Sequence, residues 1–322
     1  LDCGRPLSGL AIDTWGVDFA LIDRNGEFMG FPRHYRDPRT TDIMPELYAK
    51  VPREQLYRTT GIQMMHINTV AQLTAMQKAH DTCLDNADKL LMMPNALTYL
   101  LTGEVATEYT IATTTQAYSS VTGGWAWEVI DALGLPRTLF PQIVEPCTVS
   151  GTLRNEICSE LNCDKLPVIL VGSHDTACAV AAVPEDDCDG SWAYLSSGTW
   201  SLLGIECDSP ILTEAAMQAN YTNEGGIGVK IRFLRNIMGL WLIQQCRAQW
   251  QREGNDYTFA ELMQFAESAA PFKAFIDPDR QVFLAPGDMP ARIRSFCEET
   301  GQYVPATHGE IIRCALESLA MR

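Results

Sequence analysis

The sequence lacks the features that mark nucleic-acid-binding and membrane-spanning proteins. It contains 24 Lys and Arg residues against 40 Asp and Glu, which gives a net charge of −16. Nucleic acids and anionic membranes are bound by basic surfaces, so this balance disfavours both as partners. No apolar stretch approaches the roughly 18 residues of a membrane-spanning helix. A nucleotide remains a compatible ligand, because backbone N–H groups can hold phosphates without net positive charge.

Paired cysteines and metal-binding spacings are also missing. Eleven cysteines are scattered along the chain without a C-x-x-C pair, and the closest two are Cys158 and Cys163. An odd number of thiols in a chain too long to need disulfide staples predicts reduced cysteines in a cytoplasmic protein. The five histidines show no metal-ligand spacing, so we assign no residue to a metal.

The two best-known nucleotide-binding motifs are absent as well. Neither G-x-x-x-x-G-K-[ST] nor G-x-G-x-x-G occurs, which disfavours P-loop and Rossmann chemistry.

The chain has an ordinary globular composition, 46% hydrophobic and 20% charged, over 322 residues. That length predicts about two domains. We place the boundary between residues 186 and 187, within an acidic, turn-rich hinge at 184–190.

Hydrophobic patterning predicts alternating strands and helices. Asn25-Gly26 is a hairpin signal, so residues 17–23 and 27–31 are expected to pair antiparallel. Pro94 can open a helix over 95–101, and Gly103 can end it. Residues 105–116 are rich in Thr and predict a loop or edge strand. Further strands are predicted at 147–153, 168–171, 192–195 and 200–205, and further helices at 127–133, 177–183, 236–250 and 308–322.

One candidate site lies where the buried strand 168–171 gives way to the helix 177–183. Such strand-to-loop-to-helix switches are where α/β proteins place ligands. Asp175 lies at this switch, and its carboxylate, with a reference pKa of about 3.9, can accept a proton from a bound hydroxyl at neutral pH. The alternative is structural: Asp175 or Thr176 caps the helix.

A second candidate site is the turn Ser196-Ser-Gly-Thr199 between two predicted strands. Its backbone N–H groups and hydroxyls, including those around Gly198, are suited to hold phosphate oxygens. The alternative is an ordinary hairpin turn, because Ser and Gly fill turns for conformational reasons.

A third candidate site is the segment Asp13-Thr-Trp-Gly-Val-Asp18. Sugar sites combine polar groups with an aromatic wall, and here Thr14 and Trp15 stand beside Gly16 between two acids. The alternative is a strand with a glycine bulge.

The order of the motifs along the chain is more specific than any one of them. The series comprises Asp13-Thr-Trp-Gly-Val-Asp18, Tyr35-Arg-Asp37, Tyr57-Arg-Thr-Thr-Gly-Ile-Gln63, Leu91-Met-Met-Pro-Asn95, Leu101-Thr-Gly103, Glu108-Tyr-Thr110, Thr113-Thr-Thr-Gln116, Ser173-His-Asp-Thr176, Tyr194-Leu-Ser-Ser-Gly-Thr-Trp-Ser201, Asn223-Glu-Gly-Gly226 and Arg235-Asn-Ile-Met-Gly-Leu-Trp-Leu242. In this series the chain resembles the FGGY family of carbohydrate kinases, and within it the members that act on L-rhamnulose. The resemblance spans nearly the whole chain.

The resemblance implies an α/β protein of the actin-like ATPase (ribonuclease H-like) fold, with two domains and a cleft between them. It implies transfer of the γ-phosphoryl group of ATP, with Mg²⁺, to the 1-hydroxyl of L-rhamnulose. Asp175 is then the catalytic base. The implied sugar-binding residues are Gly16, His174, Thr176 and Asn236, to which the third motif adds Thr14 and Trp15. The implied nucleotide-binding residues are Thr199, Gln244 and Gly198.

The resemblance also predicts how the chain is divided. It makes residues 1–186 a sugar-binding N-terminal domain and 187–322 a nucleotide-binding C-terminal domain. Both ends look cut, so we expect the first phosphate hairpin and a C-terminal adenine-binding segment to be missing.

Two alternative functions stay open. A kinase for L-fuculose or D-xylulose would share this fold, and a non-catalytic actin-like sugar-binding protein is a third reading. The partners expected are a sugar and ATP, with the chain as a monomer or homodimer.

Overall fold

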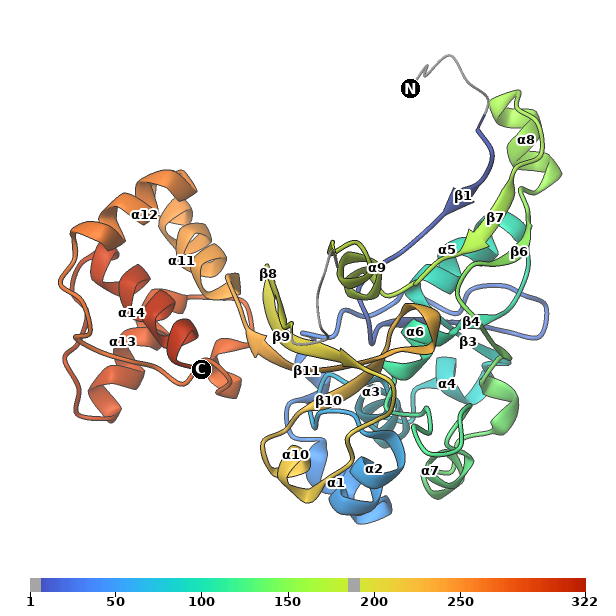
Figure 1. The fold of residues 1–322 in the computed structure, drawn as a ribbon, viewed down its shortest axis with the longest axis horizontal. Coiled ribbons are helices and arrows are strands. Elements are labelled where there is room, and N and C mark those ends of the chain that lie inside the picture. Colours follow the sequence, from blue (N-terminus) through green and yellow to red (C-terminus); the bar gives the residue numbers. More distant parts are fainter. Residues whose placement is uncertain (1–6, 185–191) are drawn as a thin grey trace. The chain divides into compact units, whose positions relative to one another are not determined.

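The computed structural model describes residues 7–184 and 192–322. Packing divides the chain into two compact units (Figure 1). Unit 1 comprises Leu1–Ala193 and Gly204–Arg235, and unit 2 comprises Tyr194–Leu203 and Asn236–Arg322. Apart from its first residue, the predicted hinge at 184–190 lies outside the described residues, and the predicted boundary stays a prediction.

A three-stranded sheet in unit 1 positions the first and third candidate segments. Strand β7 (Pro167–Leu170) lies between β1 (Leu10–Ala11), which is parallel to it, and β6 (Thr148–Thr152), which is antiparallel (Figure 1). The strands predicted at 147–153 and 168–171 are thereby confirmed. Because β1 and β7 are parallel, the loops that follow them emerge at the same edge of the sheet.

The predicted hairpin at Asn25-Gly26 forms, but it is short. Gly26 has a φ of 83°, and one antiparallel bridge joins Ile22 to Phe28. The main partner of β2 (Phe19–Ile22) is β3 (Lys89–Met92), paired antiparallel along its whole length. All four β2 residues are buried, so a strand from elsewhere in the chain has to cover their backbone groups.

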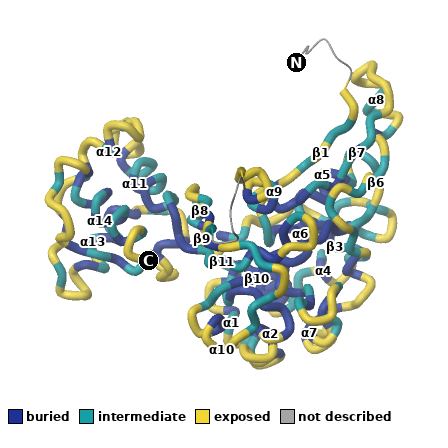
Figure 2. Tube along the Cα trace, in the orientation of Figure 1, coloured by how far each residue is buried: buried dark blue, intermediate teal, exposed yellow. Residues whose placement is uncertain are grey.

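Helices of unit 1 pack around these strands. Among the residues of this unit that the structure describes, the ten α-helices are α1 (Met44–Lys50), α2 (Arg53–Thr60), α3 (Thr69–Lys78), α4 (Thr82–Asn86), α5 (Met93–Thr102), α6 (Tyr109–Thr113), α7 (Trp127–Ala132), α8 (Asn155–Leu161), α9 (Asp175–Ala181) and α10 (Glu214–Gln218). Short 3-10 helices lie at Pro38–Thr40, Arg137–Leu139 and Ile227–Val229. Helix α3 is buried over most of its length, whereas α8 has no buried residue (Figure 2). The predicted helix after Pro94 is confirmed as α5, which ends at Gly103 with a φ of 84°.

The prediction of a loop or edge strand over 105–116 is wrong in part. Strand β4 (Thr107–Glu108) pairs parallel with β5 (Ile143–Val144), and α6 follows at once. The Glu108 carboxylate accepts hydrogen bonds from the backbone N–H groups of Thr110 and Ile111. This side-chain cap starts a helix in a Thr-rich stretch that propensity alone disfavours.

The last part of unit 1 is a hairpin from the second half of the chain. Strand β10 (Thr222–Gly225) pairs antiparallel with β11 (Ile231–Met238), with Glu224 opposite Arg232. Strand β9 (Trp200–Cys207) and β11 each contribute residues to both units.

Unit 2 contains β8 (Tyr194–Ser197) and four α-helices, α11 (Trp241–Arg252), α12 (Phe259–Ser268), α13 (Met289–Glu299) and α14 (His308–Met321). A 3-10 helix spans Gln281–Phe283. Capping boxes begin α12 at Thr258 and α14 at Thr307. The helix predicted at 308–322 is confirmed as α14, and the strands predicted at 192–195 and 200–205 as β8 and β9.

The helix predicted over 236–250 begins too early. Its first three residues belong to β11, and α11 starts at Trp241. Gly239 lies so close to the β8–β9 turn that an added Cβ would sit 2.6 Å from the Gly198 carbonyl oxygen. This packing holds the backbone extended up to Gly239, so helical geometry starts only after it.

Within the two described ranges, no helix has both the length and the apolar character needed to cross a bilayer. The nine cysteines that can be described are free thiols. In the same residues, no three His, Cys, Asp or Glu side chains group so as to hold a metal ion.

Candidate functional site

Two candidate segments meet at the edge of the β1–β7 sheet. The Thr14 backbone N–H donates to the Ser173 carbonyl (3.0 Å), and the Asp175 N–H donates to the Thr14 carbonyl (2.8 Å). A parallel bridge thus joins Thr14 to His174. The structure therefore brings Thr14, His174, Asp175 and Thr176 together in unit 1.

Trp15 is held by a buried carboxylate. Its indole Nε1 donates to Asp18 Oδ2 (2.9 Å), while 43% of the Trp15 surface stays exposed. Asp18 also accepts from the Tyr35 backbone N–H and the Gln72 amide. Burial raises the pKa of Asp18 above its ordinary value, and these hydrogen bonds oppose the rise. The indole is therefore fixed in orientation while part of its surface stays exposed.

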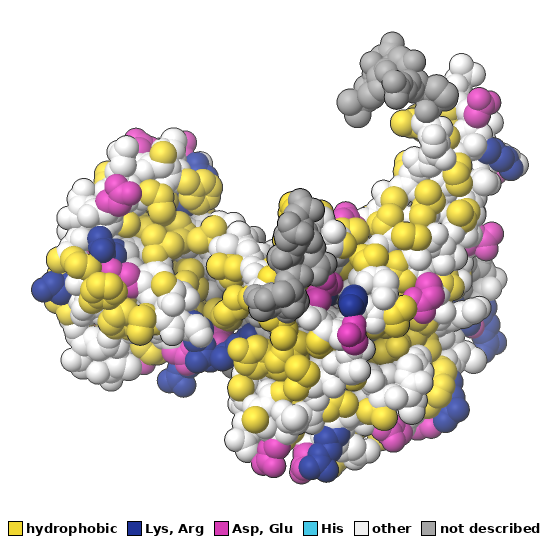
Figure 3. Space-filling view, viewed as in Figure 1, with side chains coloured by type: hydrophobic (Ala, Val, Ile, Leu, Met, Phe, Trp, Pro, Cys, Tyr) yellow, Lys and Arg dark blue, Asp and Glu magenta, His cyan; other side chains and the backbone are white. Residues whose placement is uncertain are grey.

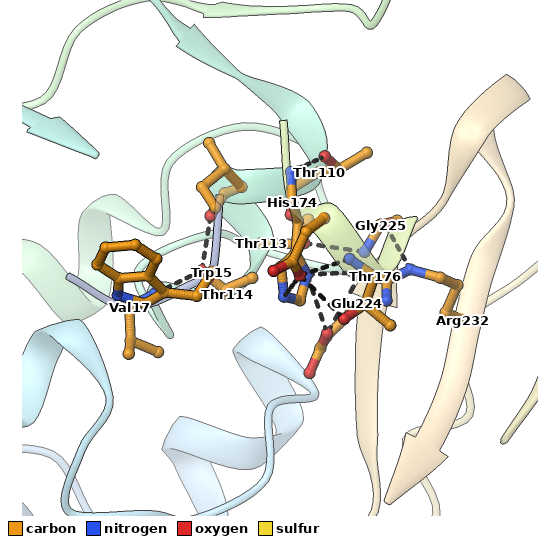
Figure 4. A network of polar contacts seen from close by, with 12 residues as sticks. Trp15, Val17, Thr110, Thr113, Thr114, His174, Thr176, Glu224, Gly225 and Arg232 are labelled. Atoms are coloured by element: carbon orange, nitrogen blue, oxygen red, sulfur yellow. Dashed lines mark hydrogen bonds and ion pairs between the residues drawn. The ribbon is translucent and has the colours of Figure 1, made fainter. Parts of the chain in front are cut away.

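The backbone beside Trp15 is shaped by threonines. Gly16 is needed for close approach, because an added Cβ would lie 3.0 Å from Thr114 Oγ1. The left-handed residue of this segment is Val17, with a φ of 66°, which is rare for a β-branched side chain. Its carbonyl accepts from Thr69 Oγ1 (2.8 Å). Its N–H donates to Thr114 Oγ1 (3.3 Å) (Figure 4). Strain at Val17 is thus held in place by named contacts.

Asp175 is the first residue of α9, and its side chain is half exposed. Its Oδ1 accepts from the Thr176 N–H (2.6 Å) and from Thr176 Oγ1 (3.1 Å). The N-cap position is His174, which makes no side-chain cap bond, so Asp175 does not cap the helix in the usual way. Partial burial raises the pKa of Asp175, the Thr176 bonds oppose the rise, and the nearby Asp13 adds to it. The result is a more basic carboxylate than a fully solvated one.

His174 is buried between two charged groups. Its Nδ1 lies 3.0 Å from Arg232 Nη2, and its Nε2 lies 3.7 Å from Asp175 Oδ1 (Figure 4). Burial first, and then the Arg232 charge, lower the pKa of His174 well below its ordinary value. The imidazole is therefore neutral at physiological pH.

Sequence reasoning missed the charged residues behind His174. Arg232 is fully buried and bonds Glu224 Oε2 (3.3 Å) and the Gly225 carbonyl (2.9 Å). Glu108 is likewise buried and accepts from the Ser173 N–H (3.0 Å). Glu108 and Glu224 fall inside motifs of the family resemblance, but nothing in the sequence marks Arg232, which reaches the site only through the β10–β11 pairing.

The predicted nucleotide-binding residues gather in unit 2. Thr199 Oγ1 lies 3.4 Å from Gln244 Nε2. The Leu240 N–H donates to the Gly198 carbonyl (2.8 Å), which fastens the β8–β9 turn to the start of α11. Gln244 is in the first turn of α11, because the helix starts later than predicted. The hydroxyl and the amide are neutral hydrogen-bond donors and acceptors, which is a kind of group that can bind a nucleotide.

Asn236, the remaining predicted sugar contact, is half-buried on β11 and belongs to unit 2, whereas the other predicted sugar residues belong to unit 1. On the face shown in Figure 3, described Lys and Arg side chains stand singly or in small groups among acidic ones, in keeping with the net negative charge.

Comparison with known proteins defines the class of protein to which this fold and site belong. Residues 4–182 match the FGGY family of carbohydrate kinases, N-terminal domain, and residues 193–322 match the C-terminal domain of the same family. The chain belongs to the FGGY family of carbohydrate kinases. It has the two-domain, actin-like ATPase fold of that family.

Particular relatives are similar over nearly all of this chain. The chain is 44% identical over 319 residues to a rhamnulokinase of Bacteroides thetaiotaomicron, covering 99% of this chain and 64% of the relative. It is 42% identical to a rhamnulokinase of Oceanobacillus iheyensis, covering 98% and 66%. The chain thus spans just under two thirds of these relatives' length. The crystal structure of xylulose kinase from Rhodospirillum rubrum is 16% identical with a TM-score of 0.74, covering 100% of this chain and 64% of that one, which supports the fold.

Proposed function

We propose that the full-length protein carrying this sequence phosphorylates L-rhamnulose at its 1-hydroxyl with ATP. The observation that carries the proposal is the Asp175 carboxylate, half exposed and of raised pKa, at the shared edge of β1 and β7. Its place in the motif series supports the proposal, as does the 44% identity to a protein named rhamnulokinase.

Asp175 is the general base. Its carboxylate takes the proton of the sugar 1-hydroxyl as that oxygen forms a bond to the γ-phosphorus of ATP and the bond to the leaving diphosphate breaks. A higher pKa makes the carboxylate a stronger acceptor, provided that it stays ionised at the working pH. A non-catalytic sugar-binding protein would gain nothing from such a group.

The sugar-binding role falls to residues around this carboxylate. His174 and Thr176 flank it, and Gly16 permits close approach of the backbone to Thr114. Trp15 presents an oriented aromatic face, which suits the apolar methyl end of a 6-deoxy sugar. Thr14 links the loop after β1 to the loop after β7. Asn236 is the further sugar contact that the family resemblance implies.

The nucleotide-binding role falls to the β8–β9 turn. The uncharged side chains of Thr199 and Gln244 would bind ATP by hydrogen bonds. Gly198 would contribute backbone groups of the turn. ATP supplies the phosphoryl group and Mg²⁺ neutralises its charge when both are bound, and we assign no residue of this chain to the metal. We place the protein in the cytoplasm, as a monomer or homodimer.

The test is a coupled kinase assay of the full-length protein over a panel of ketoses and glycerol. We expect the highest kcat/KM on L-rhamnulose, weaker activity on ketoses that share its ring stereochemistry, and very little on glycerol. An added hydroxyl in an apolar pocket is rejected by roughly 100-fold at best, so discrimination by Trp15 will be modest.

The panel separates the alternatives. Preference for D-xylulose or L-fuculose by about tenfold or more, a difference of about 1.4 kcal/mol, keeps the carbohydrate kinase and removes L-rhamnulose as its substrate. Sugar binding without turnover on any member identifies a non-catalytic binding protein.

A further inference from the structure

A buried arginine that the sequence analysis did not select, Arg232, contacts His174 of the candidate site. We infer that Arg232 is a positioning residue that holds His174 in the tautomer protonated on Nε2, so that the Nε2–H faces Asp175 and the hydroxyl that Asp175 deprotonates. The role of that hydroxyl rests on the proposed function, whereas the tautomer does not.

The direction of the hydrogen bond follows from the chemistry of the two groups. A guanidinium has five N–H donors and no acceptor, so Nδ1 of His174 has to be the unprotonated nitrogen in its 3.0 Å contact with Arg232 Nη2. In a neutral imidazole the proton then resides on Nε2. That nitrogen is the one 3.7 Å from Asp175 Oδ1.

A carboxylate competes for the same nitrogen. Glu224 Oε2 lies 3.5 Å from His174 Nδ1, and alone it would favour a proton there. The arginine contact is shorter, and Glu224 Oε2 itself accepts from Arg232 Nη2 at 3.3 Å. The Arg232 charge also opposes a second proton on the ring. The arginine therefore decides the tautomer, and Glu224 balances its charge.

The guanidinium is held rigidly. Its Nε donates to the Gly225 carbonyl (2.9 Å), and the Gly225 N–H donates to Thr113 Oγ1 (2.8 Å). An added Cβ on Gly225 would lie 2.7 Å from the Tyr109 ring, so glycine lets β10 lie directly on α6. The His174 backbone is tied to the same helix through its N–H and Thr110 Oγ1 (3.1 Å). Both partners of the Arg232–His174 contact are thus fastened to α6.

Stability alone does not explain a charged group here. Arg232 is fully buried, and its Nη1 has no partner among the described residues. A buried donor without a partner costs about 1–3 kcal/mol, and apolar replacement of a buried ion pair is often neutral or stabilising. A role in fixing His174 accounts for an arginine at this position.

This tautomer places a hydrogen-bond donor, the His174 Nε2–H, beside the proposed base, Asp175. A hydroxyl placed between the Nε2–H and Asp175 accepts from the first and donates to the second, which aims its proton at the carboxylate and its remaining lone pair elsewhere. With the proton on Nδ1, Nε2 would be a second acceptor competing with Asp175 for that proton.

The direct test is nitrogen NMR of the full-length protein labelled with ¹⁵N-histidine, with the His174 signals identified by their loss in His174→Gln. We expect neutral His174 with its proton on Nε2 at pH 7. A proton on Nδ1 in the unmodified protein overturns the inference. This measurement needs no variant of Arg232 and no activity, so it stands if the proposed function fails.

Variants extend the test. Arg232→Met removes every N–H donor of the arginine and leaves Glu224 beside Nδ1 of His174, whereas Glu224→Gln keeps the arginine contact. We expect folded Arg232→Met to carry a proton on Nδ1, which then pairs with Glu224, and to lose roughly 100-fold in kcat, the size expected for a misplaced group, with a smaller change in the sugar KM. Glu224→Gln should keep the tautomer and most of the kcat. A His174 that stays unprotonated on Nδ1 in folded Arg232→Met overturns the inference.

A control separates positioning from stability. Arg313 in unit 2 bonds the Ala266 and Ala269 carbonyls, so Arg313→Gln should lower the unfolding temperature without moving the His174 signals. Loss of kcat in the Arg232 variant with wild-type His174 signals would assign the effect to folding and defeat the positioning role.

Discussion

The two units position their candidate residues by different means. In unit 1, His174, next to Asp175, is held by the buried Arg232, which pairs with Glu224, and by the Thr110 hydroxyl, which accepts from the His174 backbone N–H. In unit 2, Thr199 and Gln244 are neutral and are placed by backbone packing of a turn against the start of α11. Substitutions in the first should therefore change proton transfer and its pH dependence, and those in the second should change affinity.

The largest expected effect is on proton transfer in unit 1. Asp175→Asn keeps the shape of the side chain but removes the base, so kcat of the full-length enzyme should fall by at least about 100-fold. Sugar affinity, measured by calorimetry, should stay within a few fold. Asp13→Asn is the matched control, since it removes a neighbouring carboxylate without removing the base. Turnover near normal in Asp175→Asn would end the assignment of the base.

A methyl group added at Gly239 tests the close packing of the β8–β9 turn against the start of α11 in unit 2. In Gly239→Ala the Cβ would lie 2.6 Å from the Gly198 carbonyl oxygen, so the turn has to shift, at a cost in stability of about 1–3 kcal/mol. The KM for ATP should rise more than that for sugar. Gly198→Ala is the comparison, because its nearest neighbour would be 3.8 Å away. Equal unfolding temperatures for the two variants would contradict the close approach.

A single hydroxyl of unit 2 should have a smaller effect. Thr199→Val removes a hydrogen-bonding group worth about 0.5–1.5 kcal/mol, so the KM for ATP should rise about two- to tenfold with little change for sugar. Thr176→Val, measured in parallel, should affect the sugar instead. If Thr199→Val changes only the sugar KM, the turn belongs to the sugar site.

The smallest expected effect is a shift of a pH profile. The proposed base has to be ionised, so we expect kcat to fall as the pH drops through the pKa of Asp175. The charge of Asp13 raises that pKa, so Asp13→Asn should lower it and move the acid limb of the kcat profile to lower pH. The neutral plateau should stay level. Asp23→Asn, in the exposed Asn25-Gly26 turn, should leave the limb in place, and a shift toward higher pH in Asp13→Asn would contradict the sign of the interaction.

Local signals in the sequence were sufficient for several elements. Pro94 and Gly103 bracket α5 as predicted, because their effects on backbone geometry are intrinsic to the residue. The strand 168–171 and the loop before α9 were likewise readable from an apolar run followed by polar residues. The same local reasoning misplaced the start of α11, where a tight contact of Gly239 with another segment keeps the chain extended.

Contacts between distant segments could not be read in this way. Val17 takes the left-handed conformation that sequence reasoning would assign to Gly16, and threonines of α3 and of the segment after α6 hold it there. Residues 204–235 pack in unit 1, although they follow residues 194–203 of unit 2 along the chain. No composition or spacing signals such a return of the chain.

The sequence by itself determined the class of protein and the position of Asp175, because a carboxylate at a strand-to-helix switch and an ordered series of motifs are local properties. Only the tertiary structure decided what surrounds that carboxylate. Arg232 and Glu224 are 57 and 49 positions further along the chain than Asp175, and they reach His174 because β10 pairs with β11 and lies on α6. Pairing register and burial set the protonation of a histidine, and neither is encoded in the residues next to it.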